Sequence, residues 1–374
     1  MSRARERTRV LFAFRRGRKA ALTAHTNNNE PDDILYGLNY FDEGRYEVGL
    51  VERDDDGGGF GGAIWYPIER LISWRTGMGF SLLAIVRNLK QLRRADVIIS
   101  IVDAMGLPIL FLKRLGLMKR PVVYVSQGLS DRVKDRVMWR WVYGWLLKAA
   151  DKLVVLGEGA ADDIAEVFGL ERGGIEVAPF GVDADYWQRD DSIKREDFVL
   201  SVGNDAARDF ETLCQAVEDK KLVIVTRQKL PGSGGGKDIV VKTGLTNGEL
   251  RLLYQRARVV VTPLKNVAQP SGQTATLQAM ACGAPVILTR TRGLWEPQIM
   301  RDEENCLLVE PGDVQDLSKA IERVVADERL VDVLGKQGRR SVEERYSSRA
   351  LGRKFQKIVD EIMFFEQPSN REGK

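Results

Sequence analysis

Short apolar runs alternate with helix-like stretches along the whole chain, and this alternation restricts the fold more than any other feature. Short, nearly continuous apolar runs are typical of parallel strands that helices cover on both faces. In the first half they predict strands at residues 9–14, 46–51, 97–102, 122–126 and 152–156. In the second half they predict strands at residues 198–202, 222–226, 239–242, 259–263, 285–288 and 306–309. The sequence therefore predicts an α/β protein with two Rossmann-like parallel-sheet domains that face a cleft.

The stretches between the strands predict helices and two irregular segments. Residues 15–30 form a long polar segment directly after the first strand, and we expect a loop there. Residues 54–62 are acidic and rich in glycine, so that Asp54–Asp56 is expected in a solvated turn rather than a metal site. Helices are expected at residues 31–41, 81–94, 208–217, 247–255, 273–281, 314–326, 331–345 and 349–365.

Length and a boundary motif predict the division into domains. A chain of 374 residues has room for about two domains. The sequence APFGVDADYW, residues 178–187, reads as the junction. We expect an N-terminal domain at 1–180, a C-terminal domain at 181–347, and a helix with a polar tail at 348–374. Parallel sheets bind ligands beyond the carboxyl ends of their strands, so a ligand is expected between the two domains.

Composition excludes several classes of protein. Hydrophobic residues are 44% and charged residues 29%, which excludes collagen-like and intrinsically disordered chains. The three cysteines lack the spacing of a metal site, so no metal is expected. No apolar stretch is long enough to span a bilayer, and the basic N-terminus lacks the apolar core of a signal peptide. We therefore expect a cytoplasmic protein.

Charge is unevenly distributed, although the net value is only +4. The excess of Lys and Arg lies in the first 150 residues, where it would suit an anionic membrane or an acidic substrate. A solvated surface without such a role is the alternative. Nucleic acid is not expected as a partner, because no binding motif accompanies the charge.

Residues 259–288 carry the clearest chemical signal. A predicted strand is followed by a loop and then by a helix that starts near Gln273. Ser271 is expected to cap this helix, and Gly272 lets a ligand approach the backbone. Free N–H groups at a helix start attract phosphate, and Lys265 adds a cation. A capped helix without a ligand is the alternative at this point.

Residues 278–287, QAMACGAPVI, closely resemble the signature of family 4 retaining glycosyltransferases of the GT-B fold. Further stretches agree in order and spacing, so that the resemblance covers about 178–347 specifically and 1–177 only by strand order. These stretches are PFGVD at 179–183, LSVGNDAARDFETL at 200–213, and residues 245–257, 293–296, 305–313 and 313–347.

The resemblance implies a sugar transfer with retention of the anomeric configuration. The donor would be a UDP- or GDP-linked nucleotide sugar, and the acceptor a glycan or a lipid-linked molecule. Cationic side chains and helix N–H groups would stabilise the departing diphosphate without a metal or another cofactor. The implied donor-binding residues are Gly203, Asn204, Arg208, Arg227, Lys265, Gln269, Ser271, Gly272, Gln273, Thr274 and Gln278.

Five positions depart from the family's pattern. The family has Arg where this chain has Asn204, and Lys where it has Arg208. Two glutamates of the family correspond to Pro270 and Gln278, so that Gln278 would hold the ribose hydroxyls without a charge. Gln127 stands where many relatives have a histidine. A non-catalytic relative that binds nucleotide or glycan, and a nucleotide-sugar epimerase, therefore stay open as alternatives.

The acceptor side is expected in the first half of the chain. Asp103 follows a predicted strand, and we expect it to face the cleft and to bind or deprotonate an acceptor hydroxyl, with Gln127 orienting the substrate. Gly17 and His25, in the predicted first loop, are expected near the acceptor. Residues 65–94 and 132–148 mix aromatic, aliphatic and basic side chains. They predict either a peripheral membrane surface or core helices with basic outer faces.

Overall fold

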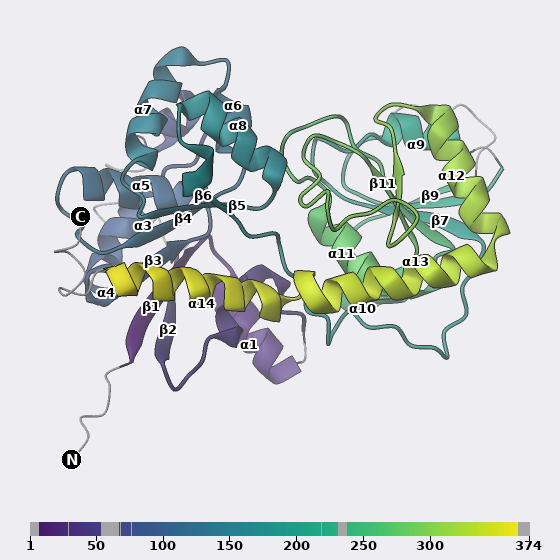
Figure 1. Cartoon of the computed structure of the whole chain (residues 1–374), viewed down its shortest axis with the longest axis horizontal. Coiled ribbons are helices and arrows are strands. Elements are labelled where there is room, and N and C mark those ends of the chain that lie inside the picture. Colours follow the sequence, from purple (N-terminus) through teal and green to yellow (C-terminus); the bar gives the residue numbers. More distant parts are fainter. Residues whose placement is uncertain are drawn as a thin grey trace. The chain divides into compact units, whose positions relative to one another are not determined.

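The computed structural model describes residues 7–28, 30–53, 67, 69–75, 77–217, 219–230 and 238–365. The chain divides into two compact units (Figure 1). Unit 1 contains Met1–Asn28, Ile34–Ala178 and Leu351–Lys374, and unit 2 contains Asn29–Asp33 and Pro179–Ala350. The predicted acidic turn at 54–62 lies outside the described residues. Each unit has its own six-stranded sheet, which confirms the predicted fold class.

The sheet of unit 1 is parallel throughout and has the order β2-β1-β3-β4-β5-β6. Five of its strands are those that the sequence predicts, with ends shifted by a residue or two. The sixth, β6, was not predicted, because its three residues are too short to form a recognisable apolar run. The strands are β1 (Thr8–Phe14), β2 (Tyr46–Glu52), β3 (Val97–Ser100), β4 (Val122–Ser126), β5 (Lys152–Val155) and β6 (Ile175–Val177).

The segment after β1 is largely helical, so the predicted loop at residues 15–30 is wrong. It contains a helix, α1 (Arg18–Asn28). The Glu52 carboxylate, at the end of β2, accepts hydrogen bonds from the backbone N–H groups of Arg18 at 2.7 Å and Lys19 at 3.4 Å. A carboxylate at this end stabilises a helix through its free N–H groups and its dipole. The start of α1 is thus capped by a side chain of strand β2.

Two predicted helices of unit 1 are shorter or more broken than expected. Residues 31–41 form the 3₁₀ turns η1 (Asp33–Leu35) and η2 (Leu38–Tyr40), because Tyr36 and Gly37 between them have positive φ. Residues 81–94 divide at Asn88 into α3 (Leu82–Arg87) and α4 (Leu89–Arg94). The other helices are α5 (Asp103–Arg114), α6 (Leu129–Val133), α7 (Val137–Leu147), α8 (Glu158–Phe168) and η3 (Arg172–Gly174).

The sheet of unit 2 is also parallel, in the order β12-β11-β10-β7-β8-β9. All six strands match the predicted ones within a residue at each end. They are β7 (Phe198–Val202), β8 (Lys221–Val225), β9 (Ile239–Lys242), β10 (Val259–Thr262), β11 (Val286–Thr289) and β12 (Leu307–Val309).

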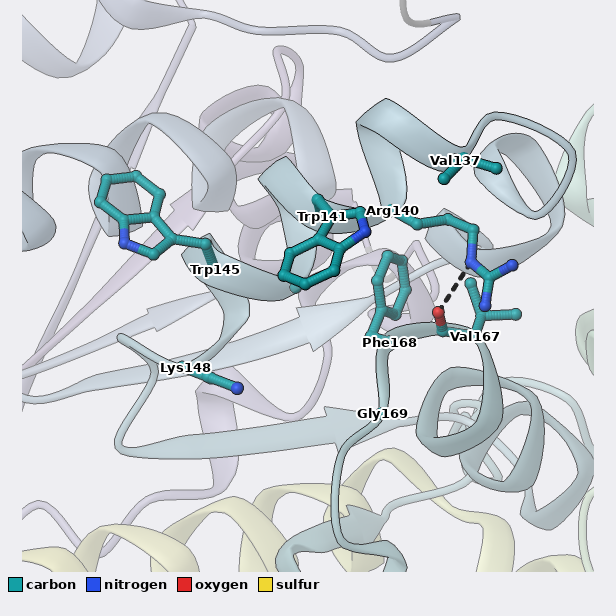
Figure 2. A pocket seen from close by; sticks show the side chains of 9 residues that line it. Val137, Arg140, Trp141, Trp145, Lys148, Val167, Phe168 and Gly169 are labelled. Carbon is teal, nitrogen blue, oxygen red and sulfur yellow. Dashed lines mark hydrogen bonds between the residues drawn. The ribbon is translucent and has the colours of Figure 1, made fainter.

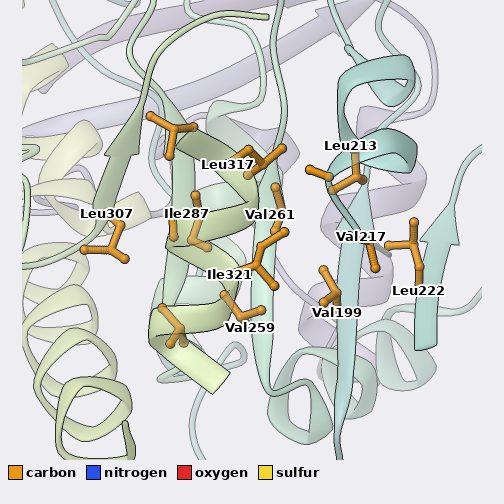
Figure 3. Close-up of a cluster of buried hydrophobic side chains, with 14 of the residues drawn as sticks. Val199, Leu213, Val217, Leu222, Val259, Val261, Ile287, Leu307, Leu317 and Ile321 are labelled. Carbon is orange, nitrogen blue, oxygen red and sulfur yellow. The ribbon is translucent and has the colours of Figure 1, made fainter. Parts of the chain in front are cut away.

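One apolar cluster joins the sheet of unit 2 to three of its helices (Figure 3). Leu213 of α9 and Leu317 and Ile321 of α12 pack on Val199 and Val261 of the central strands. These side chains are at most 2% exposed, and their burial stabilises the unit by about 1.5–3 kcal/mol each. The helices of unit 2 are α9 (Phe210–Ala216), α10 (Asn247–Arg256), α11 (Gln273–Ala281), α12 (Val314–Ala326), α13 (Glu328–Ser341) and the π-helix η4 (Val342–Tyr346).

The long last helix, α14 (Ser348–Phe365), belongs to unit 1 from Leu351 onward. Phe355 is fully buried, and its ring meets that of Phe12 of β1 edge-on at 6.2 Å. Gly352 lies so close to the Gly37 carbonyl oxygen that an added Cβ would approach it to 2.5 Å. The helix is therefore part of the core of unit 1. The predicted domain boundaries after residues 180 and 347 stay predictions.

Among the described residues, no helix is both long and apolar enough to cross a membrane.

Candidate functional site

In each sheet the strand order reverses at one point, and in unit 2 this point lies between β7 and β10. Ligands of parallel α/β sheets bind beyond the carboxyl ends of the strands at such a reversal. The loops that follow β7 and β10 are joined there by two backbone hydrogen bonds. Lys265 N–H donates to Ala207 O at 2.8 Å, and Asp209 N–H donates to Pro263 O at 3.1 Å. The two loops therefore hold one shape.

Arg208 is the central side chain of this reversal. It is 5% exposed, and its Nε donates to the Asp205 carboxylate at 3.0 Å. Its Nη1 is buried and has no hydrogen-bond partner among the described residues. Burial lowers the pKa of the guanidinium, and Asp205 opposes that shift. An Arg stays charged nevertheless, so this site holds a cation with an unused donor.

Two glycines make room for the guanidinium. A Cβ at Gly203 would lie 2.0 Å from Arg208 Nε. A Cβ at Gly272 would lie 3.2 Å from Arg208 Nη1 and 2.5 Å from Thr262 Cγ2. Gly272 also has φ +75°, a conformation that glycine adopts without strain. The guanidinium is thus enclosed between the loop after β7 and the start of α11.

Helix α11 begins at Gln273, as predicted, but its cap differs from the prediction. The N-cap residue is Gly272, which has no side chain, so the expected cap by Ser271 is wrong. The Ser271 N–H instead bonds to Gln269 O at 2.7 Å. The Gln273 side chain is directed to the backbone, where its Oε1 accepts from Phe180 N–H at 3.2 Å. The Gln273 side chain thus contacts the chain near residue 180 rather than the loop that precedes it.

Gln278 takes part in a buried hydrogen-bond network that no motif in the sequence indicates. Its Nε2 donates to Asp33 Oδ2 at 2.7 Å, and its Oε1 accepts from the Tyr254 hydroxyl at 3.3 Å. Trp187 Nε1 and Asp183 N–H also donate to the Asp33 carboxylate, at 2.9 and 2.6 Å. Burial raises the pKa of Asp33 to about 7, although these donors oppose the shift.

The remaining predicted donor residues are at the surface. Arg227, Lys265, Asn204 and Thr274 are exposed. The Asn204 side chain accepts from the Arg227 N–H at 2.6 Å, so the loop after β7 also positions the loop after β8. Arg227 and Lys265 thus carry exposed cations on loops that adjoin the buried Arg208.

In unit 1 the strand order reverses between β1 and β3, and Asp103 lies there. It is the first residue of α5 rather than the end of a strand, since β3 ends at Ser100. Its carboxylate is 6% exposed and accepts from the Tyr124 hydroxyl, and from the Gln127 N–H at 3.4 Å. Burial raises the pKa of Asp103, against the effect of these donors.

Gln127 is held tightly beside Asp103. Its Nε2 donates both to the Tyr36 hydroxyl and to Ile101 O, each at 2.7 Å. Gly17, with φ +88°, immediately precedes α1. His25 lies on α1 and not in a loop, which corrects its expected setting. Asp103 and Gln127 therefore form one cluster. The sequence placed them after two different predicted strands, 97–102 and 122–126, which are neighbours in the sheet.

In the described part of the chain, no three His, Cys, Asp or Glu side chains gather into a group fit to hold an ion.

Two family descriptions match different parts of the chain. Residues 34–186 match "Glycosyltransferase Family 4", and residues 204–327 match "Glycosyl transferases group 1". A curated relative, an MMP alpha-(1->4)-mannosyltransferase of Mycolicibacterium hassiacum, is 27% identical over 214 residues. These are 52% of this chain and 50% of that protein, so the chain spans about half of the length of this relative.

Solved structures agree over nearly the whole chain. A sucrose-phosphate synthase of Thermosynechococcus elongatus superposes with a TM-score of 0.68 and 16% identity, covering 96% of this chain and 99% of that one. HepE of Anabaena, solved with UDP-glucose, gives a TM-score of 0.67 and 12% identity, covering 94% and 99%. At this identity the likeness shows the fold alone, which is that of GT-B glycosyltransferases. With the two family matches, it follows that the chain belongs to the group 1, family 4 glycosyltransferases.

Proposed function

We propose that the protein transfers a hexose from a nucleotide-diphosphate sugar to a glycan or lipid-linked acceptor. The observation that carries the proposal is the buried Arg208 guanidinium, whose Nη1 has no hydrogen-bond partner among the described residues and lies beside Gly272 at the start of α11. A diphosphate is the anion that matches both features. HepE was solved with UDP-glucose, which supports a nucleotide sugar as the donor class.

The departing diphosphate sets the proposed chemistry. Negative charge grows on its β-phosphate as the sugar bond breaks, and a preformed cation with helix N–H groups stabilises that charge. Arg208 supplies the cation, and exposed Arg227 and Lys265 contribute further positive charge. We propose that this arrangement replaces a metal ion and that the anomeric configuration is retained. Asp103, whose pKa burial raises, is the proposed acceptor-side base.

Thermal unfolding with UDP, GDP and ADP tests the donor site. A nucleotide at 100 times its dissociation constant stabilises the native state by about 2.7 kcal/mol. We expect a rise in Tm with UDP or GDP that disappears in Arg208→Ala and persists in Arg256→Ala, whose side chain pairs with Glu196 on the outside of unit 2. An unchanged Tm with every nucleotide would contradict the proposal.

Product analysis tests the finer claims. We expect the anomeric proton coupling of the product to match that of the donor, and turnover to persist in excess EDTA. An inverted product or a loss of turnover in EDTA would contradict retention or metal independence.

One observation favours a second candidate, a relative that binds a nucleotide but does not transfer. The side-chain amides of Gln127 and Gln278 are both engaged within the protein. That candidate predicts nucleotide binding without turnover on any acceptor, and measurable transfer eliminates it. An epimerase would instead alter the donor sugar without any acceptor.

A further inference from the structure

Helix α7 exposes an apolar face. Val137, Met138, Trp141 and Trp145 are 67%, 65%, 79% and 47% exposed. They recur at the spacing of one helical face, which is the arrangement expected of the buried side of an amphipathic helix. The opposite side of α7 already packs on unit 1 through Tyr143, Leu146 and Leu147. The outer face therefore has no role in the core, and the predicted alternative of core helices with basic outer faces does not describe it.

A second helical stretch, residues 69–75, extends this face. Trp74 is 73% exposed and Leu71 is 56% exposed. The two stretches are joined because Arg136 Nη1 donates to Arg75 O at 2.7 Å. Leu71 and Trp74 line one shallow hollow together with Met138 of α7. We call the outer face of α7 together with residues 71–75 the aromatic surface.

Cations surround the aromatic rings of this surface. Arg75 lies over the Trp74 ring at 5.4 Å, and Arg114 lies over the Trp145 ring at 5.3 Å. A second hollow, shown in Figure 2, has Trp141 and Trp145 along it and Lys148 at one end. Arg140 lines its other end and donates from Nε to Val167 O at 3.0 Å. Among the described residues that line the two hollows, none is a carboxylate.

We propose that the aromatic surface docks the protein on an anionic phospholipid bilayer, with α7 lying in the plane of the interface. Tryptophan rings have an apolar body and a polar N–H, which suits the level of the lipid headgroups. Lys and Arg beside them attract anionic headgroups, and no lining carboxylate repels them. A protein partner would be expected to present charges of both signs, whereas an anionic bilayer presents a uniformly negative surface. The charge pattern therefore favours a lipid surface as the occupant.

Cosedimentation with vesicles tests the proposal without donor or acceptor, so its outcome is independent of the proposed function. We expect the full chain to bind vesicles of phosphatidylcholine with 30% phosphatidylglycerol, and to bind pure phosphatidylcholine vesicles much more weakly. Trp74→Ser with Trp141→Ser should weaken binding at least tenfold. Lys148→Gln should weaken it about fivefold, since one cation at an anionic surface is worth about 1 kcal/mol.

The matched control is Val333→Ser with Lys336→Gln, which removes one exposed apolar side chain and one exposed cation from α13 of unit 2. This variant should bind like the unmodified protein. Brominated lipids should also quench tryptophan fluorescence less in the Trp74 and Trp141 variant. Equal binding by all variants, or no binding to anionic vesicles, overturns the proposal. If the tryptophan substitutions instead convert a dimer to a monomer in sedimentation velocity, the surface is an interface between copies, and the proposal is also overturned.

Discussion

Each sheet has one point where the strand order reverses, and side chains of opposite type, a basic one and an acidic one, are buried at the two points. In unit 2 the point between β7 and β10 encloses the Arg208 guanidinium. In unit 1 the point between β1 and β3 encloses the Asp103 carboxyl group. Both groups are buried. Within the described parts of the chain Arg208 Nη1 has no hydrogen-bond partner, whereas Asp103 accepts from Tyr124 and Gln127.

This difference indicates that topology sets where the two buried groups lie, whereas a few side chains set their charge and hydrogen bonding. A buried cation with a spare donor favours an anion. A buried carboxyl group with a raised pKa favours exchange of a proton with a hydroxyl. In the proposed reaction, unit 2 would supply the leaving-group site and unit 1 the acceptor site.

The largest expected effect concerns Asp33, a buried carboxyl group of unit 2 that can be compared with Asp103 of unit 1. Burial raises its pKa from 3.8 to about 7, so the folded state favours the protonated form. Its contribution to stability is complete below about pH 4 and is lost as pH rises to about 7. Three pKa units correspond to about 4 kcal/mol. We expect the unfolding free energy of the unmodified protein to fall relative to Asp33→Asn between pH 4 and 7. If the unfolding free energies of the two proteins change equally between pH 4 and 7, the raised pKa of Asp33 is contradicted.

The second test compares two glycines at the two reversals. A Cβ at Gly106 of α5 would lie 2.3 Å from the Tyr124 ring and 2.8 Å from Ser100 Oγ, both in the core. We expect Gly106→Ala to cost about 3 kcal/mol by urea unfolding, since overpacked cores cannot relax freely. Gly203→Ala meets the Arg208 side chain instead, so it should weaken UDP or GDP binding more than it lowers stability.

Gly248→Ala, on α10, is the control for the glycine comparison, because a Cβ added there would have no atom within 4 Å. It should leave stability unchanged or raise it by up to about 1 kcal/mol. If Gly106→Ala behaves like this control, the core around Tyr124 is not closely packed.

The third test separates the acceptor site from the donor site. Asp103→Asn removes the proposed base, and we expect about a 100-fold loss of transfer rate. The nucleotide dissociation constant should change less than twofold, because Asp103 belongs to unit 1 and Arg208 to unit 2. A lower Tm with an unchanged transfer rate would instead give Asp103 a structural role.

How far the sequence predicts the molecule depends on whether the relevant contact is local. Apolar runs predicted eleven of the twelve strands, because burial on both faces determines their composition. Helix α1 was missed because its capping carboxylate, Glu52, lies 34 residues away. The importance of Arg208 was predicted from a motif. Its burial against Gly203 and Gly272 was not, since those positions meet only in the folded chain.

Asp33 and the aromatic surface show the same limit. The Asp33 carboxylate is contacted by Gln278, 245 residues later, and no periodicity in residues 31–41 indicates this. The sequence marked residues 132–148 as either interface or core. Only the fold shows which side of α7 is already covered by unit 1.

The smallest test removes one donor from the acceptor cluster. Tyr124→Phe deletes the hydroxyl that donates to Asp103, and we expect a loss of about 1–2 kcal/mol in unfolding free energy. The pKa of Asp103 should rise further, because a donor to the charged form is lost. The pH dependence of transfer should move upward accordingly. An unchanged pH profile would show that Asp103 does not titrate in the reaction.

The membership of α14 in unit 1 has a consequence for synthesis and for engineering. Phe355, Ile358 and Val359 are core residues of a unit whose sheet begins at Thr8. On the ribosome, unit 1 therefore completes its core only after every strand of unit 2 has been synthesised. A chimera that exchanges the first half of the chain with that of a relative must exchange this helix too, because otherwise two cores evolved apart would meet at Phe12 and Phe355.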